Sequence, residues 1–284
     1  MKMNFKGLAL VLITLLATSY FGIRFYQQQQ LPKVPTEEQT AKNPVFLIPG
    51  TNATNKRFNS FTELLMEEQV TSNAVLKIQV KKDGGIHYLN QLKKSSERPF
   101  IVVGFEDNTE KAVDIEAKWF QNVVLDVKKK YPFSTFDAVG HSNGGLVLAT
   151  YLENYQTTSN PQMNRLITIA TPFNDTTAEY NDNNLAFTEV KKASHLLTNF
   201  IEKQTQLPSS LKVLAIAGDQ EKNETHSDGV VPVQSALASR LFIKKQVASY
   251  QESIITGKQT GHSDLLDNSK VQKQVKAFIY QDEN

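Results

Sequence analysis

The sequence contains no cysteine among its 284 residues. Disulfide bonds, thiolate metal sites, a cysteine nucleophile and an anchor built on a lipid-modified cysteine are therefore excluded. A chain without cysteine is compatible with the cytosol, and equally with an exported bacterial protein that folds without disulfide bonds. The cellular compartment must be inferred from another part of the sequence.

A strong excess of charge of one sign is also missing. The chain has 31 Lys and Arg residues against 29 Asp and Glu, which leaves a formal net charge of +2. This balance predicts no nucleic-acid or polyanion partner. No internal repeat is evident, and the 40% hydrophobic and 21% charged composition is that of an ordinary globular protein. Nothing in the sequence indicates the oligomeric state.

The N-terminus has the pattern of an export signal. Lys2 and Lys6 precede GLALVLITLLATSYFGI, an uncharged and mainly apolar run over residues 7–23. Small residues at 17–19 offer a cleavage site, but the run is also just long enough for a membrane-spanning helix, which needs at least ~17 residues. A buried core helix is disfavoured, because the run is basic in front and apolar all round. We expect residues 1–23 to be a cleaved signal peptide or a retained membrane anchor, and both place the rest of the chain outside the cytoplasm.

A polar segment follows this apolar run. Residues 24–43, RFYQQQQLPKVPTEEQTAKN, are rich in glutamine and contain two prolines. Such a composition is typical of a stalk or linker. The folded domain is therefore expected to cover residues 44–282.

Within residues 44–282, apolar runs of strand length alternate with segments of helical periodicity. Strands are expected in VFLIPG (45–50), PFIVVGFE (99–106), FDAVG (136–140), RLITIATPF (165–173), LKVLAIAGD (211–219) and QESIITG (251–257), and AVLKIQVKKDGGIHYLN (74–90) predicts a hairpin. Helices are expected over 58–69, 114–131, 146–155 and 268–281, the last capped by Asn268 or Ser269.

This alternation predicts an α/β fold. Strands that are apolar on both faces and separated by amphipathic helices form a mostly parallel central sheet covered by helices on both faces. The segment between the strands at 165–173 and 211–219 is too long for an ordinary connection and shows helical periodicity over 186–204. We expect a helical cap insertion at about 174–210, over a site at one edge of the sheet.

The stretch DAVGHSNGGLVLATYLE, residues 137–153, places a serine among glycines where a strand ends and a helix begins. A buried strand that reverses tightly into a helix strains the backbone of the residue at the turn, and side chains on its neighbours would collide with the strand and helix. Gly140 and Gly144 relieve this crowding. The pattern predicts that Ser142 is a nucleophile at the carboxyl edge of the sheet.

A serine nucleophile needs a base, which we expect to be His262. His262 follows the last strand and lies in GKQTGHSDLL. Because loops that leave parallel strands emerge at the same edge of the sheet, this histidine is expected beside Ser142. His141, within the turn itself, is expected to help pack it, whereas His87 and His195 are expected to be structural or exposed.

The carboxylate that orients the base should follow the preceding strand, LKVLAIAGD. Asp219 and Asp228 both fit. Asp228 is preferred because it stands in an Asp-x-x-Val-Pro arrangement with Val231 and Pro232, whereas an aspartate after a glycine usually accepts turn hydrogen bonds. His226 remains an alternative site histidine.

An oxyanion hole requires two N–H donors. The backbone N–H of Asn143, directly after the nucleophile, is expected to be one of them, and that of Thr51 in PGTNAT the other. The alternative for Pro49 and Gly50 is a simple strand terminator.

In the order Ser142, Asp228, His262, these residues resemble the catalytic triad of the alpha/beta-hydrolase fold. FLIPGTNAT, FDAVGHSNGGLV, SDGVVPVQSA and GHSDLL, behind an N-terminal signal, resemble the lipase-like cell-surface hydrolases of Gram-positive bacteria, a family of unknown physiological function. One departure is Pro49-Gly50, where many lipases have His-Gly. The resemblance implies a serine hydrolase that cleaves acyl esters, small or lipid-like, through an acyl-enzyme, with no metal or organic cofactor.

Other functions fit the same residues. A peptidase or thioesterase uses the same triad, and a surface-displayed binding module can keep the fold without catalysis. The insertion can also recruit a partner. Its apolar residues Phe187, Val190, Leu197 and Ile201 either line an acyl pocket or, as is commoner at that spacing, pack the cap against its own domain. Residues 7–23 allow membrane association, so the protein is expected at the cell surface or secreted.

Overall fold

The computed structural model describes residues 43–66, 75–92, 98–221 and 225–281. All of them belong to one unit, Glu37–Asn284. The predicted export signal, residues 1–23, and linker residues 24–42 lie outside the described residues. In the described part of the chain, no helix is both long enough and apolar enough to cross a lipid bilayer.

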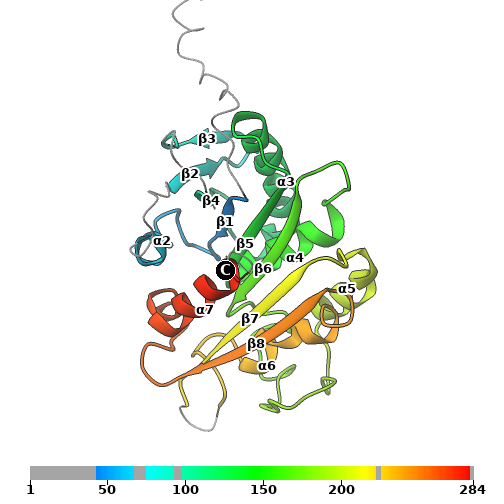
Figure 1. The fold of residues 1–284 in the computed structure, drawn as a ribbon. Helices are drawn as coiled ribbons and strands as arrows, with labels where there is room; N and C mark the ends of the chain where they lie inside the picture. Colours follow the sequence, from blue (N-terminus) through cyan, green and yellow to red (C-terminus); the bar gives the residue numbers. More distant parts are fainter. Residues whose placement is uncertain (1–42, 67–74, 93–97, 222–224, 282–284) are drawn as a thin grey trace, which may run out of the picture. The chain divides into compact units, whose positions relative to one another are not determined.

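The described chain forms one eight-stranded sheet in the order β3-β2-β4-β1-β5-β6-β7-β8 (Figure 1). The strands are β1 (Val45–Ile48), β2 (Val75–Val80), β3 (Ile86–Tyr88), β4 (Phe100–Phe105), β5 (Thr135–His141), β6 (Gln162–Ile169), β7 (Lys212–Asp219) and β8 (Ser249–Thr256). Only the hairpin β2–β3 pairs antiparallel, and the other pairs are parallel. The predicted mostly parallel α/β sheet and its hairpin are confirmed.

Helices cover both faces of this sheet (Figure 1). The α-helices are α2 (Asn59–Met66), α3 (Val113–Lys130), α4 (Asn143–Asn154), α5 (His195–Lys203), α6 (Val233–Ala236) and α7 (Ser269–Ile279), and short 3₁₀ helices lie at η2 (Glu110–Ala112), η3 (Gln204–Gln206), η4 (Ala238–Leu241) and η5 (Asp264–Asp267). Helix α7 starts where predicted, since the Asn268 side chain accepts hydrogen bonds from the N–H groups of Lys270 and Val271.

Alternation of side chains along the central strands divides the core in two. Phe46 and Ile48 of β1 join one buried cluster with apolar residues of α3 and α4, and Val45 and Leu47 join another with residues of α2 and α7. Successive residues of a strand point to opposite faces, so a strand that is apolar at every position is buried on both. The continuous apolar runs in the sequence therefore correspond to the centre of the sheet.

The insertion between β6 and β7 is less helical than predicted. Helix α5 begins at His195, where the side chain of Ser194 accepts a hydrogen bond from the N–H of Leu197. The expected start near residue 186 is wrong because the carbonyls of Leu185 and Phe187 accept hydrogen bonds from Arg240 instead of forming helical ones. The start of the helix in the insertion is thus determined by contacts with η4 and not by the periodicity of its own sequence.

The apolar residues of the insertion pack against its own domain rather than line an acyl pocket. Phe187 and Leu197 are buried in core clusters. Val190 and Ile201 are partly buried against them. Of the two alternatives for these residues, the structure favours packing.

The amino end of the sheet holds a buried ion cluster. Asp137 of β5 is fully buried and lies against the guanidinium groups of Arg98 and Arg165, the latter at 3.5 Å. Removing one partner of a buried ion pair leaves an uncompensated charge. We expect Asp137→Asn to lower the free energy of unfolding in urea by about 3–5 kcal/mol.

The matched control is the exposed ion pair between Glu179 and Lys192. Exposed pairs contribute at most about 1 kcal/mol, so Glu179→Gln should change stability little. Equal effects of the two substitutions would contradict this account of the buried cluster.

The free energy of unfolding is expected to depend on pH through the buried side chain of Glu153 in α4. Its side chain is buried beside a small cavity between α3, α4 and α5, and its Oε1 has no hydrogen-bond partner among the described residues. Burial raises the pKa of Glu153 to about 8. The folded protein therefore holds a proton that the unfolded chain releases near pH 4.5, so stability falls as the pH rises from about 4.5 to 8.

Glu153→Gln mimics the protonated side chain and should remove this contribution. We expect the loss of unfolding free energy between pH 5 and pH 8 to be smaller by about 2 kcal/mol in the variant than in the wild type. Burial also raises the pKa of Glu116 to about 8, so Glu116→Gln should act in the same direction. Parallel pH curves for the wild type and Glu153→Gln would contradict the assignment.

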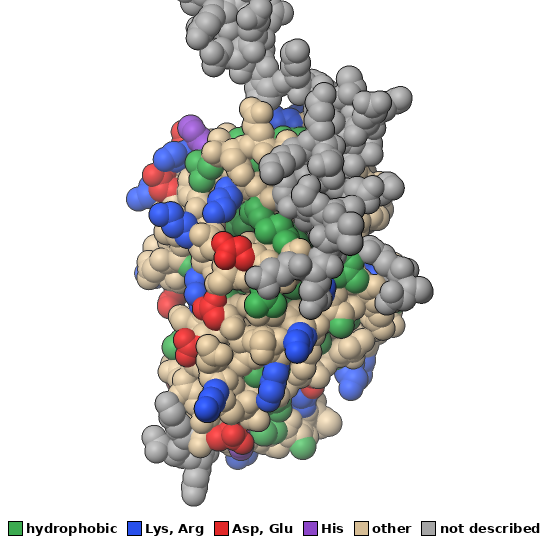
Figure 2. Space-filling view, turned by 60° about the vertical axis from the view of Figure 1, so that its left-hand side comes forward, with side chains coloured by type: hydrophobic (Ala, Val, Ile, Leu, Met, Phe, Trp, Pro, Cys, Tyr) green, Lys and Arg blue, Asp and Glu red, His purple; other side chains and the backbone are tan. Residues whose placement is uncertain are grey.

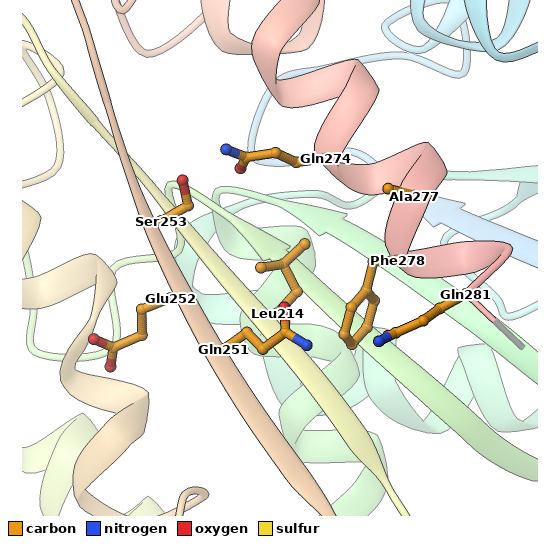
Figure 3. A pocket seen from close by; sticks show the side chains of 8 residues that line it. All are labelled: Leu214, Gln251, Glu252, Ser253, Gln274, Ala277, Phe278 and Gln281. Atoms are coloured by element: carbon orange, nitrogen blue, oxygen red, sulfur yellow. The ribbon is translucent and has the colours of Figure 1, made fainter.

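On the face seen in Figure 2, basic and acidic side chains are mixed, and neither kind forms a patch of its own. A hollow of about 390 Å³ lies between β7, β8 and α7, with Leu214 and Phe278 among its lining residues (Figure 3). Its residues come from the last two strands, the last helix and Gln281 just after that helix, and none belongs to the predicted triad.

Candidate active site

Ser142 lies in the sharp turn between β5 and α4. Its φ of 54° and ψ of −131° are unusual for a residue with a side chain. The turn has no room for side chains on the flanking glycines: a Cβ on Gly144 would lie 2.1 Å from the carbonyl oxygen of Ile48, and one on Gly140 would lie 2.5 Å from the Cα of Gly145. The glycines permit the turn for the steric reason that the sequence suggested.

The hydroxyl of Ser142 is available for chemistry. Although Ser142 occupies the N-cap position of α4, its side chain makes no capping hydrogen bond. Its Oγ lies instead 3.0 Å from Nε2 of His262. The N-terminus of α4 directs backbone N–H groups and the positive end of the helix dipole toward this position.

His262 connects Ser142 to Asp228. The Nδ1 of His262 lies 2.7 Å from Oδ2 of Asp228. An ionised carboxylate can only accept hydrogen bonds, so Nδ1 carries a proton and the neutral ring presents the lone pair of Nε2 to the serine. The structure thus brings Ser142, His262 and Asp228 into one hydrogen-bonded chain.

The loop after β7 orients Asp228. Its Oδ1 accepts hydrogen bonds from the N–H groups of Val230, at 2.9 Å, and Val231, at 2.7 Å. The carbonyl of Asp228 accepts a further hydrogen bond from the N–H of His262 at 2.9 Å. The Asp-x-x-Val-Pro arrangement therefore folds into a turn that leaves Oδ2 for the imidazole.

Asp219, the alternative acid, lies elsewhere in the same loop cluster. Its Oδ2 is 2.6 Å from Nδ1 of His226, and its Oδ1 accepts a hydrogen bond from the N–H of Glu221. Asp219 and His226 therefore pair with each other and not with His262. Of the two candidates, only Asp228 contacts the imidazole next to the serine.

Two further hydrogen bonds hold the loop at His262 and Ser263. Nε2 of His141 donates a hydrogen bond to the His262 carbonyl at 2.9 Å, and Arg57 donates to the carbonyl of Ser263. Burial, with a further contribution from His262, lowers the pKa of His141 to about 3, so this ring is neutral near neutral pH. His141 thus holds the backbone of His262 in place, a more specific part than the packing predicted for it.

Thr51 and Asn143 face each other across the site. Nδ2 of Asn143 donates a hydrogen bond to Oγ1 of Thr51 at 2.6 Å. Neither the Thr51 nor the Asn143 backbone N–H donates to another described residue. A Cβ on Gly50 would lie only 2.7 Å from that of Ser142, so the loop that carries Thr51 runs directly beside the serine.

The remaining predicted histidines lie away from this site. His87 is exposed in β3, and His195 begins α5, where its Nδ1 contacts the side chain of Asn199. Among the described side chains, no group of three or more His, Asp and Glu is arranged to hold a metal ion.

The contacts that hold the loop of His262 were not predictable from the sequence. Arg57 and His141 lie far from His262 in the chain, and Asp267, which Arg57 also approaches at 3.9 Å, lies in η5. Their residue types and spacing carried no signal, because the contacts exist only once the segments at the carboxyl ends of β1, β5 and β8 meet at one edge of the sheet.

Comparison with known proteins gives the family. Residues 32–282 match the family described as "alpha/beta hydrolase of unknown function (DUF915)". A solved structure from Listeria innocua, the product of its gene lin2722, is 34% identical, covers 84% of this chain and 94% of its own, and superposes with a TM-score of 0.78.

A second solved structure, described as a candidate cell surface hydrolase of Lactobacillus plantarum WCFS1, is 30% identical. The match covers 86% of this chain and 92% of the other, with a TM-score of 0.70. No curated protein matches the sequence.

Proposed function

The chain belongs to the DUF915 family of alpha/beta hydrolases, and we propose that it is a serine hydrolase that cleaves carboxylic esters through an acyl-enzyme. The observation that carries the proposal is the chain of hydrogen bonds from Ser142 through His262 to Asp228, at 3.0 and 2.7 Å. A serine is a weak nucleophile by itself, and an adjacent base with an orienting carboxylate is the arrangement that activates it.

The proposed mechanism has two halves. His262 takes the proton from Ser142 as the hydroxyl oxygen attacks the ester carbonyl carbon, and it returns that proton to the leaving alcohol as the acyl-enzyme forms. Water, deprotonated by the same imidazole, then attacks the acyl carbon; the bond to Ser142 Oγ breaks, Oγ takes the proton back from His262, and the acid is released. Asp228 holds the ring and stabilises its protonated form.

The backbone N–H groups of Thr51 and Asn143 are the proposed donors to the oxyanion. Both are free of other described partners, and the hydrogen bond between the two side chains holds the two loops together beside Ser142. Donors fixed in advance stabilise developing charge without reorganising during the reaction.

A series of p-nitrophenyl esters of increasing chain length, assayed beside peptide and thioester substrates, tests the reaction class. The proposal expects turnover of the esters and stoichiometric labelling of the protein by a fluorophosphonate. Preferential turnover of peptides or thioesters would favour the alternative acyl hydrolases. Absence of labelling would favour a binding module.

The proposed location is outside the cytoplasm, at the cell surface or secreted. The apolar run at 7–23 supports it, and so does the description of the Lactobacillus relative as a cell surface hydrolase candidate. Fractionation of the source cells into cytoplasm, membrane and medium tests this, and a protein found only in the cytoplasmic fraction would contradict it.

A further inference from the structure

A second Asp–His pair lies beside the candidate triad. Asp219 at the end of β7 is 2% exposed, and its Oδ2 lies 2.6 Å from Nδ1 of His226. The side chain of His226 is 40% exposed, so the buried carboxylate holds a ring that reaches solvent. The mechanism proposed above uses neither residue.

The pairing decides what the ring of His226 presents. Because Nδ1 is engaged with the carboxylate, the neutral imidazole presents the lone pair of Nε2 to any hydroxyl that approaches it. Nε2 contacts no other described residue through a hydrogen bond. The contact with Asp219 thus fixes the orientation of the His226 ring, and Nε2 remains available to a ligand.

His226 lines a cavity of about 420 Å³ at the rim of the domain. One wall comes from the insertion and the other from the loop that carries Asp228, whose neighbours Ser227 and Gly229 both line it. The complete lining is Thr176, Ala178, Asn181, Asn183, Gln220, Thr225, His226, Ser227, Gly229, Val230 and Pro232.

The eleven lining residues include seven with polar side chains and four without, Ala178, Gly229, Val230 and Pro232. None of them is Lys, Arg, Asp or Glu, whereas hydroxyl and amide side chains come from both walls. A charged ligand would lack a counter-ion here, and an acyl chain would leave these polar groups without partners.

We propose that this cavity binds a neutral, hydroxyl-rich group, and that the substrate is the acyl ester of a polyol or carbohydrate. The assignment rests on the proposed esterase function for its catalytic part. The acyl carbonyl lies at Ser142, while the alcohol part extends along the Asp228 loop and hydrogen-bonds to Nε2 of His226. The fixed hydroxyl and amide groups provide the further partners that a polyol needs.

The kinetic test compares two esters with the same acyl chain, glycerol monobutyrate and methyl butyrate. His226→Ala should lower kcat/KM for the glycerol ester by about tenfold, the loss expected for one substrate hydrogen bond, and leave that for methyl butyrate unchanged. Thr176→Val, on the opposite wall, should act in the same selective way, and His226→Gln should restore part of the loss. The exposed His87→Ala is the matched control.

An equal loss of activity on both esters would overturn the proposal, since His226 would then only support the Asp228 loop. No loss on either ester would overturn it as well. Folding of each variant is checked by circular dichroism and by fluorophosphonate labelling of Ser142.

A binding measurement separates this inference from the proposed function. Methyl glucoside and glycerol are titrated into the wild type and into His226→Ala, with ligand-observed NMR as the readout. Binding that is lost in the variant supports the cavity even if the wild type hydrolyses neither ester, a result that would refute only the esterase. Absence of binding to the wild type, or equal binding to both proteins, overturns the cavity assignment.

Discussion

Replacement of Ser142 by alanine is expected to abolish ester hydrolysis, with a loss of about 10⁶-fold in kcat, the size seen when the nucleophile of a serine hydrolase is removed. The reason is that no other hydroxyl lies within hydrogen-bond distance of Nε2 of His262 among the described residues. Labelling by a fluorophosphonate should disappear together with activity. Initial rates on p-nitrophenyl butyrate measure the effect.

Ser134→Ala is the control for this experiment. Ser134 is exposed and precedes the same strand, β5, at its opposite end. The variant should keep full activity and labelling. Residual labelling of Ser142→Ala at the wild-type rate would show that the reactive residue is another one, and the site described here would have to be abandoned.

Replacement of Asp228 by asparagine is expected to cost about 10⁴-fold in kcat, because the imidazole loses the carboxylate that fixes its tautomer and stabilises its charge. Asparagine keeps an oxygen that can accept from the N–H groups of Val230 and Val231, so the loop should remain folded. The same assay as for Ser142→Ala applies, with circular dichroism as a check of folding.

Asp219→Asn is the matched variant for the second acid. Asp219 is as buried as Asp228 and also contacts a histidine, but that histidine is His226 and not the ring beside Ser142. Its replacement should leave hydrolysis of methyl butyrate near the wild-type rate. A larger loss for Asp219→Asn than for Asp228→Asn would reverse the assignment of the triad acid.

These two experiments also separate the rival functions. A catalytically silent binding module would show no rate to lose in Ser142→Ala or Asp228→Asn. A peptidase or thioesterase would lose its activity in both variants, since the same three residues would serve those reactions as well. The triad variants therefore test the chemistry, while the panel of substrates tests the bond that is cleaved.

Local features explain why the serine was predictable from the sequence. The glycines around Ser142 reflect a turn in which a Cβ would meet backbone atoms, and the requirement for that turn is present in a few consecutive residues. The order of strands and helices was equally accessible, because strands buried on both faces are apolar at every position. His262 followed from the rule that loops after parallel strands share one edge.

Where several elements compete for the same backbone groups, local pattern was insufficient. The predicted helix over 186–204 has the right periodicity, yet it begins only at His195, because Arg240 takes the carbonyls of Leu185 and Phe187. The role of His141 likewise depends on the carbonyl of His262, a partner brought close by the packing of the final loop against the turn.

The sequence by itself determined the α/β layer order, the strand–turn–helix around Ser142 and the edge at which the candidate residues meet, since each depends on periodicity or on sterics within a short segment. The tertiary structure alone decided that Asp228 contacts His262 while Asp219 contacts His226, and that a cavity with hydroxyl and amide side chains in its lining forms beside His226. Both aspartates follow the same strand, so their partners depend on how two loops fold around each other, and hydrogen bonds across such distances leave no local trace in the chain.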